Sequence, residues 1–591
     1  MSDLVGARPV CPLKETSLRV KGPITVTRPV VHHLGLLGVP LPSRDEEPLV
    51  AEVAWAGIHP DEEVVDEATA QAATGIAHLH GRRDGEPRGL AVDFASAICS
   101  VLTVQGLLAA LIGRARGGPA ARTVRTAVDR SAVFSVAQYL AAACADEEEA
   151  VSFAPGGPPF TTADGVLFEV EALDPEVWIS FWRNIGTSER LAGSAWRAFQ
   201  FRYATASSPL PPELHATTRA VDWSAVRRAA AESRASVCRL RTLDERAVEP
   251  REDRPWRLSP YPAIDEGPRG RVRIRGLGEE RPLAGFTVLE AGRRIQAPLA
   301  AHVLGLLGAD VIRIEPPGGD PLRGMPPACG GLSARWLALN RGKGAVEIDI
   351  KSASGRDDLR SLARESAVFL HNWAPGTAER LGLDHGDLTA VNPRLIYAYT
   401  GGWAGRLDDT PVGTDFMVQA RTGLGEALRP ADETPAPSLM TVLDVVGGLL
   451  GAEAILAALL LRETGEAGCV RVDSSLQGAA ELLSERALRR IADGQDPRMP
   501  AGFRRPFRTA DGWVALADDS AEAFTAGGAG TPEDLRSLTT DQAVGKLRGS
   551  GLHATAVVTA LGKLPGDPRM SGSLIRDQHG ALTVPTPWEF T

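Results

Sequence analysis

A chain of 591 residues is too long for one hydrophobic core and predicts two to four domains, and 43% apolar with 23% charged residues is ordinary for a soluble globular protein. The net charge of −10 argues against a nucleic-acid-binding surface. The first residues hold no apolar stretch of signal-peptide length, so we expect a cytoplasmic location. Six cysteines lack CxxC or CxxxH spacing, which predicts neither a disulfide framework nor a metal site.

The chain repeats itself at a nearly constant offset of 348 residues. Because several matches share one register, they predict two copies of one module rather than chance agreement of short helices. The matching pairs are QAATG (71–75) with QARTG (419–423), GLLAALIGR (106–114) with AILAALLLR (454–462), TVRTAVDRSA (123–132) with RVDSSLQGAA (471–480) and FTTADG (160–165) with FRTADG (507–512).

The two copies are unequal. Ser96 occupies the place that corresponds to Asp444, since 444 − 348 = 96, and the nearest acid, Asp93, lies three residues earlier. The first copy also lacks a counterpart to residues 283–400. Residues 249–281, dense in Pro, Gly and charge, predict a linker.

The second copy opens with an α/β pattern. The stretch FTVLEA predicts a strand, APLAAHVLGLLGA a helix and DVIRIE a parallel strand, and further strands are expected at GAVEIDI, AVFLHN and RLIYAY. This order predicts a doubly wound parallel sheet, which binds ligands beyond the carboxyl ends of its strands. Neither GxGxxG after the first strand nor GxxxxGK[ST] occurs, so dinucleotides and nucleoside triphosphates are poor candidates.

A single acid, Asp444, opens an apolar helix that we expect to be too short and too Gly-interrupted to span a bilayer. An Asp at a helix start is most often an N-cap, and the helix dipole there stabilises its ionised form. An ionised carboxylate among apolar neighbours can also act as a nucleophile. Gly447 and Gly448 in the first turn are expected to leave room for a substrate.

These motifs, in this order, resemble the class III acyl-CoA transferases, a family that includes formyl-CoA and carnitine CoA-transferases and the α-methylacyl-CoA racemases. The resemblance covers residues 282–512, with a weaker tail to the C-terminus, and 67–245 in the first copy. It implies an α/β fold with a Rossmann-like doubly wound large domain and a small α/β domain, in two tandem copies of which the first is truncated and degenerate. The expected divisions are 1–60 (N-terminal extension), 61–248 (truncated first copy), 249–281 (linker), 282–500 (Rossmann-like CoA-binding large domain) and 501–591 (small domain and C-terminal return segment).

The resemblance implies that Asp444 is the catalytic aspartate of an acyl-CoA:carboxylate CoA-transferase. It would attack the thioester of an acyl-CoA donor, form a covalent aspartyl-CoA intermediate and pass CoA to a small carboxylic acid acceptor. Coenzyme A is then a substrate, and no tightly bound cofactor or metal is needed. The family's glycine-rich loop ahead of the small domain is reduced here to Gly502 within RMPAGFRRPFRT, which departs from the pattern.

Six further residues match CoA-binding positions of the family. A solvated turn or a surface ion pair, such as one with Glu379, is the ordinary alternative for several of them. Thr414 precedes the aspartate of the GTD motif where the racemases place a histidine base, so two-base racemisation is disfavoured. The matching residues are Gln296, Lys343, Asn372, Trp373, Arg380 and Asp415.

Three functions stay open from the sequence. The first is CoA transfer through Asp444, the second is another acyl-thioester reaction such as racemisation, isomerisation, elimination or cyclisation, and the third is non-catalytic acyl-CoA binding. Family members are homodimers of interlocked subunits, so the tandem copies imply an intrachain pseudo-dimer, with further association of two chains left open. We expect no nucleic-acid or membrane partner.

Overall fold

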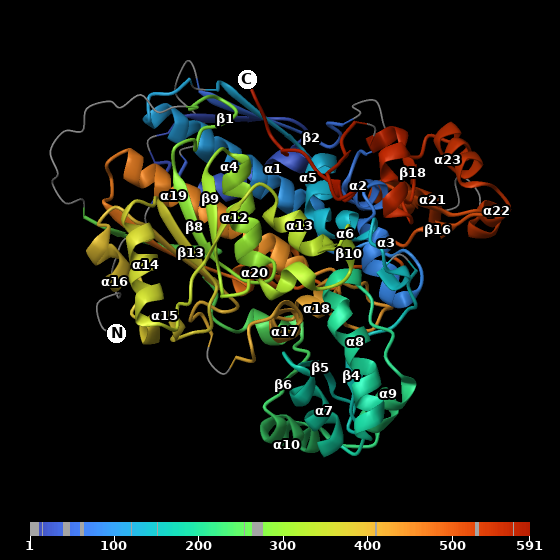
Figure 1. Ribbon diagram of the computed structural model, residues 1–591. Coiled ribbons are helices and arrows are strands. Elements are labelled where there is room, and N and C mark those ends of the chain that lie inside the picture. Colours follow the sequence, from blue (N-terminus) through green and yellow to red (C-terminus); the bar gives the residue numbers. More distant parts are fainter. Residues whose placement is uncertain are drawn as a thin grey trace.

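The computed structural model describes residues 11–591 except 15, 40–47, 59–63, 120, 151, 253, 263–275, 408, 409, 526–530 and 571. We call residues 11–262 the first half and residues 276–591 the second half. Figure 1 shows two central α/β layers and two smaller domains, one below the centre and one at the right.

The larger sheet has seven strands in the order β12-β9-β8-β13-β14-β15-β7. All neighbours are parallel except β7, which pairs antiparallel with β15. Side chains alternate between the faces, so Val288 and Val368 pack in the same core cluster as α12 and α19, whereas Leu289 and Phe369 pack with α14. The doubly wound fold and the predicted strands are therefore confirmed. The elements are β7 (Trp256–Tyr261), β8 (Thr287–Ala291), β9 (Asp310–Glu315), β12 (Gly344–Glu347), β13 (Val368–His371), β14 (Ile396–Gly401), β15 (Cys469–Ser475), α12 (Gln296–Leu306), α13 (Ala334–Asn340), α14 (Ala353–Arg364), α16 (His385–Val391), α17 (Asp415–Arg421), α19 (Val442–Glu463) and α20 (Leu476–Ala492).

The first half builds a shorter version of this sheet, in the order β1-β2-β3-β21. Strands β1, β2 and β3 are parallel and β21 is antiparallel to β3. The segment expected as an N-terminal extension is thus part of the first copy, because β1 and β2 belong to its sheet and α1 packs on them. Its elements are β1 (Leu18–Lys21), α1 (Ile24–Leu36), β2 (Leu49–Ala54), α2 (Glu67–Ala73), α4 (Phe94–Ala115), β3 (Thr123–Ala127), α5 (Val128–Ser135), α6 (Ala137–Ala142) and, from the C-terminus, β21 (Glu589–Phe590).

Each half carries a small domain with a three-stranded antiparallel sheet and its own apolar core. Both begin near the repeated TADG motif, as the resemblance implied. The first, below the centre of Figure 1, comprises β4 (Phe160–Thr161), β5 (Leu167–Glu171), α7 (Pro175–Asn184), α8 (Glu189–Thr205), α9 (Pro212–Arg219), α10 (Trp223–Ser233) and β6 (Ser236–Arg239). The second, at the right, comprises β16 (Phe507–Arg508), β17 (Trp513–Leu516), α21 (Asp518–Thr525), α22 (Pro532–Arg536), α23 (Thr540–Gly549) and β18 (Ala554–Ala556).

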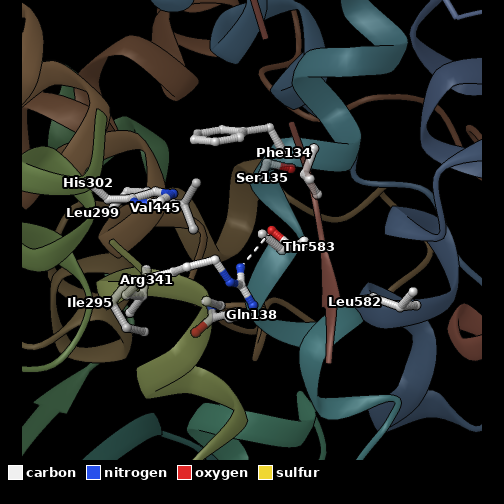
Figure 2. A pocket seen from close by; sticks show the side chains of 14 residues that line it. Phe134, Ser135, Gln138, Ile295, Leu299, His302, Arg341, Val445, Leu582 and Thr583 are labelled. Carbon is white, nitrogen blue, oxygen red and sulfur yellow. Dashed lines mark hydrogen bonds between the residues drawn. The ribbon is translucent and has the colours of Figure 1, made fainter. Parts of the chain in front are cut away.

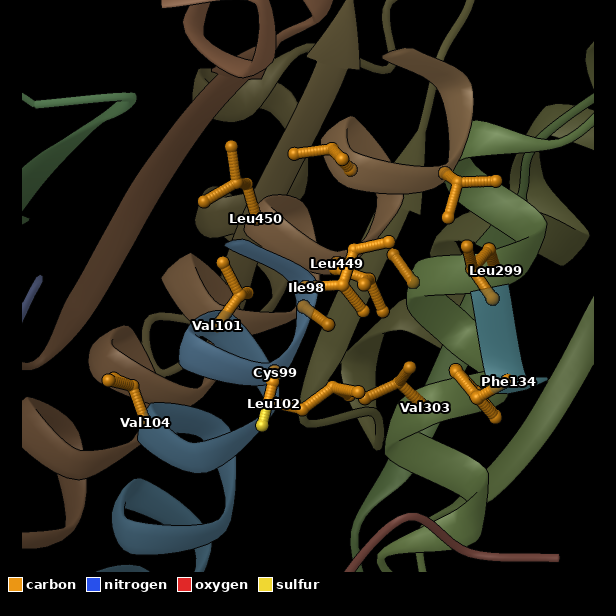
Figure 3. Packing of buried hydrophobic residues seen from close by; sticks show 14 of the residues in the cluster. Ile98, Cys99, Val101, Leu102, Val104, Phe134, Leu299, Val303, Leu449 and Leu450 are labelled. Atoms are coloured by element: carbon orange, nitrogen blue, oxygen red, sulfur yellow. The ribbon is translucent and has the colours of Figure 1, made fainter. Parts of the chain in front are cut away.

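The two halves exchange their last strands. Strand β7, which follows the first small domain, completes the sheet of the second half, and β21, which follows the second small domain, completes the sheet of the first. Between the sheets, α4 packs on α19, and both contribute to one shared apolar cluster (Figure 3). The sheet of each half is therefore completed by a strand of the other half, and the two halves share one apolar core.

The helices α4 and α19 each have 22 residues and are apolar and long enough to cross a membrane, so the expectation that the Asp444 helix is too short was wrong. The most apolar segments of α4 and α19 are, however, 94% and 100% buried inside the protein. The one charge in the middle of α19, Glu453, is also buried. Its Oε1 lies 2.6 Å from His33 Nε2 and accepts a 3.0 Å hydrogen bond from the Trp256 indole, both residues of the first half. The apolar run is thus a core helix at the interface of the halves.

Candidate active site

A large cavity opens at the carboxyl edge of the seven-stranded sheet, where a doubly wound fold binds ligands. Its volume is about 1190 Å³, and Asp444 lies in its wall. A second cavity behind the first turn of α19, between Val445, His302 and Gln138, measures only about 20 Å³ and has room for one water (Figure 2). The large cavity is therefore the candidate substrate site.

Asp444 is the third residue of α19 and not its N-cap, which corrects the expectation from sequence. The N-cap is Thr441, in the left-handed conformation with φ 53°, and its side chain forms no capping hydrogen bond. The capping carboxylate comes from another helix, because Asp415 Oδ2 accepts a 2.7 Å hydrogen bond from the backbone N–H of Asp444. The side chain of Asp444 is thereby free to face a substrate.

The glycines of this turn serve helix packing. A Cβ on Gly448 would lie 2.7 Å from the backbone oxygen of Gln296, and one on Gly447 would lie 2.9 Å from a methyl carbon of Leu476. The expectation that they leave room for a substrate was therefore wrong. They let α19 approach α12 closely, which fixes the distance from Asp444 to the loop ahead of α12.

The first half repeats this capping arrangement. Glu67, which corresponds to Asp415 since 415 − 348 = 67, accepts from the backbone N–H groups of Ala95 at 2.7 Å and Ser96 at 2.9 Å. The amide of Gln419 donates to Asp415 and the amide of Gln71 donates to Glu67 in the same way. Ser96 therefore stands at the structural equivalent of Asp444, with a hydroxyl in place of the carboxylate.

We expect Asp415→Ala and Glu67→Ala each to lower the free energy of unfolding by about 1–3 kcal/mol, because each leaves buried helix-start N–H groups without an acceptor. Only Asp415→Ala should also reduce activity strongly, since it alone positions Asp444. Urea unfolding and initial rates measure the two effects. Equal losses of activity in the two variants would contradict this assignment.

Burial raises the pKa of Asp444 to about 6, against the opposing effect of Arg294 and Arg335. Burial and the charge of Asp444 raise the pKa of Asp415 well above its usual range, which favours its neutral form. Burial alone would lower the pKa of Arg294, but Tyr203, Glu171 and Asp444 raise it. Asp444 is thus negative at neutral pH and lies within the electrostatic reach of two arginines.

The rate of attack by Asp444 should rise with pH through about 6, because the protonated acid below this pKa is a poor nucleophile. A pH profile of kcat/KM from 4.5 to 8 at constant ionic strength measures this. A flat profile across this range would contradict the role of Asp444.

Residues of the first half complete the site. Leu173 and Tyr203 line the cavity, and Glu171 accepts a 3.0 Å hydrogen bond from the Thr414 hydroxyl and pairs with Arg202 at 3.1 Å. Sequence reasoning missed Glu171 and Tyr203, along with Arg294 and Arg335. The only signal was the repeat itself, which predicts that the two small domains have equivalent positions.

The loop ahead of each small domain faces the other half. Arg504, from the loop with Gly502, donates to Asp93 and Asp518 at 2.7 Å and lies at the first half's counterpart of the site. The corresponding loop of the first half contains Gly156 and Gly157, with φ 137° and 147°. A Cβ on Gly157 would lie 2.9 Å from Leu439, five residues before Asp444, so only glycine permits this approach. The first half thus contributes a two-glycine loop next to the segment that leads into α19.

Four of the predicted CoA contacts, Gln296, Asn372, Trp373 and Asp415, line the large cavity together with Asp444. Lys343 and Arg380 are not among the lining residues. The Lys343 ammonium is buried and donates to Glu290 at 3.0 Å, to the Pro298 carbonyl at 2.8 Å and to Asn340 at 2.9 Å. Arg380 is exposed on α15 (Thr377–Leu381), where it donates to Thr377. Contact of any of these residues with CoA stays a prediction.

The model of CoA-transferase family III matches residues 57–254 and again 283–561. A probable fatty acyl-CoA transferase of Mycobacterium tuberculosis is 34% identical over 261 residues, which cover 40% of this chain and 65% of that protein. Succinyl-CoA:glutarate CoA-transferase of Mus musculus is 30% identical over 291 residues, covering 46% and 66%. Both are thus matched over just under two thirds of their length. A solved CAIB/BAIF family protein of Brucella suis has 26% identity and a TM-score of 0.47, over 53% of this chain and 93% of that one.

Proposed function

The chain belongs to CoA-transferase family III, and from this premise we propose that it transfers CoA between an acyl-CoA and a carboxylic acid through Asp444. The observation that carries the proposal is the position of Asp444, an acid with a pKa of about 6 in the wall of a cavity of about 1190 Å³ at the carboxyl edge of the sheet. Carboxylates of this kind act as nucleophiles toward thioesters. The relatives named above for CoA transfer support the same reaction class.

In the proposed reaction, an oxygen of Asp444 attacks the thioester carbonyl, the C–S bond breaks, and a mixed anhydride and free CoA thiolate result. The thiolate attacks the aspartyl carbonyl, which gives an aspartyl-CoA thioester and releases the donor's carboxylate. An acceptor carboxylate then attacks the aspartyl thioester and frees the thiolate again. The thiolate finally attacks the acceptor's carbonyl, which forms the new acyl-CoA and regenerates the carboxylate of Asp444.

We further propose that the two halves act as an intrachain pseudo-dimer with one working site. The exchanged strands, the cavity-lining Tyr203 and the Gly156–Gly157 loop support the view that the first half supplies the partner surface. Ser96 and the Arg504 ion pairs occupy its own counterpart of the site. A cytoplasmic location and further association of two chains stay predictions.

The test is incubation with a panel of acyl-CoA donors and small carboxylic acids in D₂O, analysed by mass spectrometry. We expect acceptor-dependent formation of a new acyl-CoA without deuterium at the α-carbon. Deuterium at the α-carbon without CoA transfer would replace this proposal by an isomerisation or racemisation. Binding of acyl-CoA with neither product would indicate a binding protein.

A further inference from the structure

Two arginines from different elements of the second half act on the charge of Asp444. Arg294 lies in the loop between β8 and α12 and lines the large cavity, and Arg335 lies in the first turn of α13. Both act electrostatically on Asp444, and each also acts on the other. Among the described residues, neither forms an ion pair, and Arg335 Nε is buried without a hydrogen-bond partner. Arg335 thus keeps a buried donor without a partner, and Arg294 is exposed to the cavity beside the Tyr203 ring, an arrangement that suits an anion which the protein itself does not supply.

The backbone holds Arg294 in an unusual conformation. Its φ is 66°, a left-handed value that a long side chain rarely adopts. The loop is fixed from the side by Asn372, whose amide accepts from the Arg293 N–H and donates to the Arg293 carbonyl, both at 2.8 Å. Such a conformation persists only where the surroundings determine it, and it aims the guanidinium into the cavity.

The other charged groups nearby do not cancel the two cations. Glu171 already pairs with Arg202 and accepts hydrogen bonds from Tyr203 and Thr414. Asp415 is driven toward its neutral form by burial and by Asp444. Asp444 acts on both Arg294 and Arg335, whereas Glu171 acts on Arg294 and is already paired with Arg202. The two cations are therefore only partly neutralised in the resting site.

We propose that Arg294 and Arg335 bind the carboxylate of the acceptor, and that covalent modification of Asp444 strengthens this binding. The inference rests on the proposed function. Once the carboxyl group of Asp444 is converted to an anhydride or a thioester, its negative charge is lost and both cations lose this counter-ion. The acceptor carboxylate is then drawn to the electrophilic aspartyl carbonyl at the stage when it must attack. Before modification, Asp444 repels the same carboxylate, so the order of the two half-reactions follows from charge.

Asp444→Asn imitates the neutral, modified state without chemistry, so it separates binding from catalysis. Isothermal titration with succinate at pH 8 should show about tenfold to a hundredfold tighter binding to Asp444→Asn than to wild type, as expected for a charge-assisted contact in a buried site. The neutral analogue succinamide should bind both proteins equally. Asp444→Ala is a second neutral variant, and thermal unfolding checks that each variant is folded.

Adding Arg335→Gln or Arg294→Gln to Asp444→Asn should abolish the gain in succinate affinity. Adding Arg335→Lys instead should keep part of this gain. Arg364→Gln, an exposed arginine at the end of α14, is the matched control and should leave the gain intact. Equal succinate binding by wild type and Asp444→Asn, or a gain that persists without Arg335 and Arg294, would overturn the inference. These titrations test only the binding role of the two arginines. The proposed function fails in a different experiment, if wild type forms no covalent adduct with acyl-CoA.

Discussion

Asp444→Asn is expected to lower the rate of CoA transfer by at least about a thousandfold, because the amide cannot replace the carboxylate as nucleophile. The isosteric amide keeps the volume of the side chain, so thermal stability should change little. Initial rates with a competent donor and acceptor measure the loss.

Ser96→Ala is the matched control for this variant, since Ser96 occupies the equivalent position in the first half. It removes the hydroxyl that donates to Glu67, and the rate should stay within about threefold of wild type because Ser96 lies at the non-working counterpart of the site. More than a tenth of the wild-type rate in Asp444→Asn, or a comparable loss in Ser96→Ala, would contradict the assignment of the nucleophile.

The second half produced together with β7, as residues 256–591, but without the rest of the first half, is expected to be unstable and inactive. Without α4, apolar side chains of α19 such as Leu449 and Leu450 become exposed, at a cost of about 1.5–3 kcal/mol for each side chain. A few such losses approach the whole stability of a domain, about 5–15 kcal/mol. Strand β21 also loses its partner β3, and the cavity loses Tyr203.

Co-expression of residues 1–255 with residues 256–591 provides the control, because it keeps every contact and interrupts only the chain. We expect this pair to copurify and to recover a large part of the activity. Solubility, copurification and initial rates are the measurements. A folded, fully active second half on its own would show that the first half contributes nothing to the site.

Local sequence patterns were sufficient for the parallel strands of the second half but not for β7, which lies in the segment 249–281 that was wrongly expected to be a linker throughout. The strands β8, β9, β13 and β14 lie where apolar runs of four to six residues predicted them, and α19 lies on its apolar run. The repeat predicted two small domains. These features depend on side-chain periodicity and turn residues close in sequence, which a single chain displays directly.

The composition of the site could not be read in the same way. Glu171 and Tyr203 reach Asp444 through packing of the first small domain on the second half, over more than 200 residues of sequence. Asp415, which lies 29 residues before Asp444 in the sequence, caps the start of α19. The sequence pattern close to this helix start had predicted Asp444 itself as the cap. The exchange of loops between halves likewise places Gly157 near Leu439, which no local pattern reveals.

The most direct test of the account is trapping of the covalent intermediate. Wild type is mixed with acyl-CoA without an acceptor, quenched with hydroxylamine and digested, and the peptide that contains Asp444 is analysed by mass spectrometry. The account predicts a hydroxamate on Asp444 that is absent without acyl-CoA and absent when an acceptor carboxylate is added before the quench. An unmodified Asp444 peptide under conditions in which CoA transfer proceeds would contradict the covalent role of this aspartate.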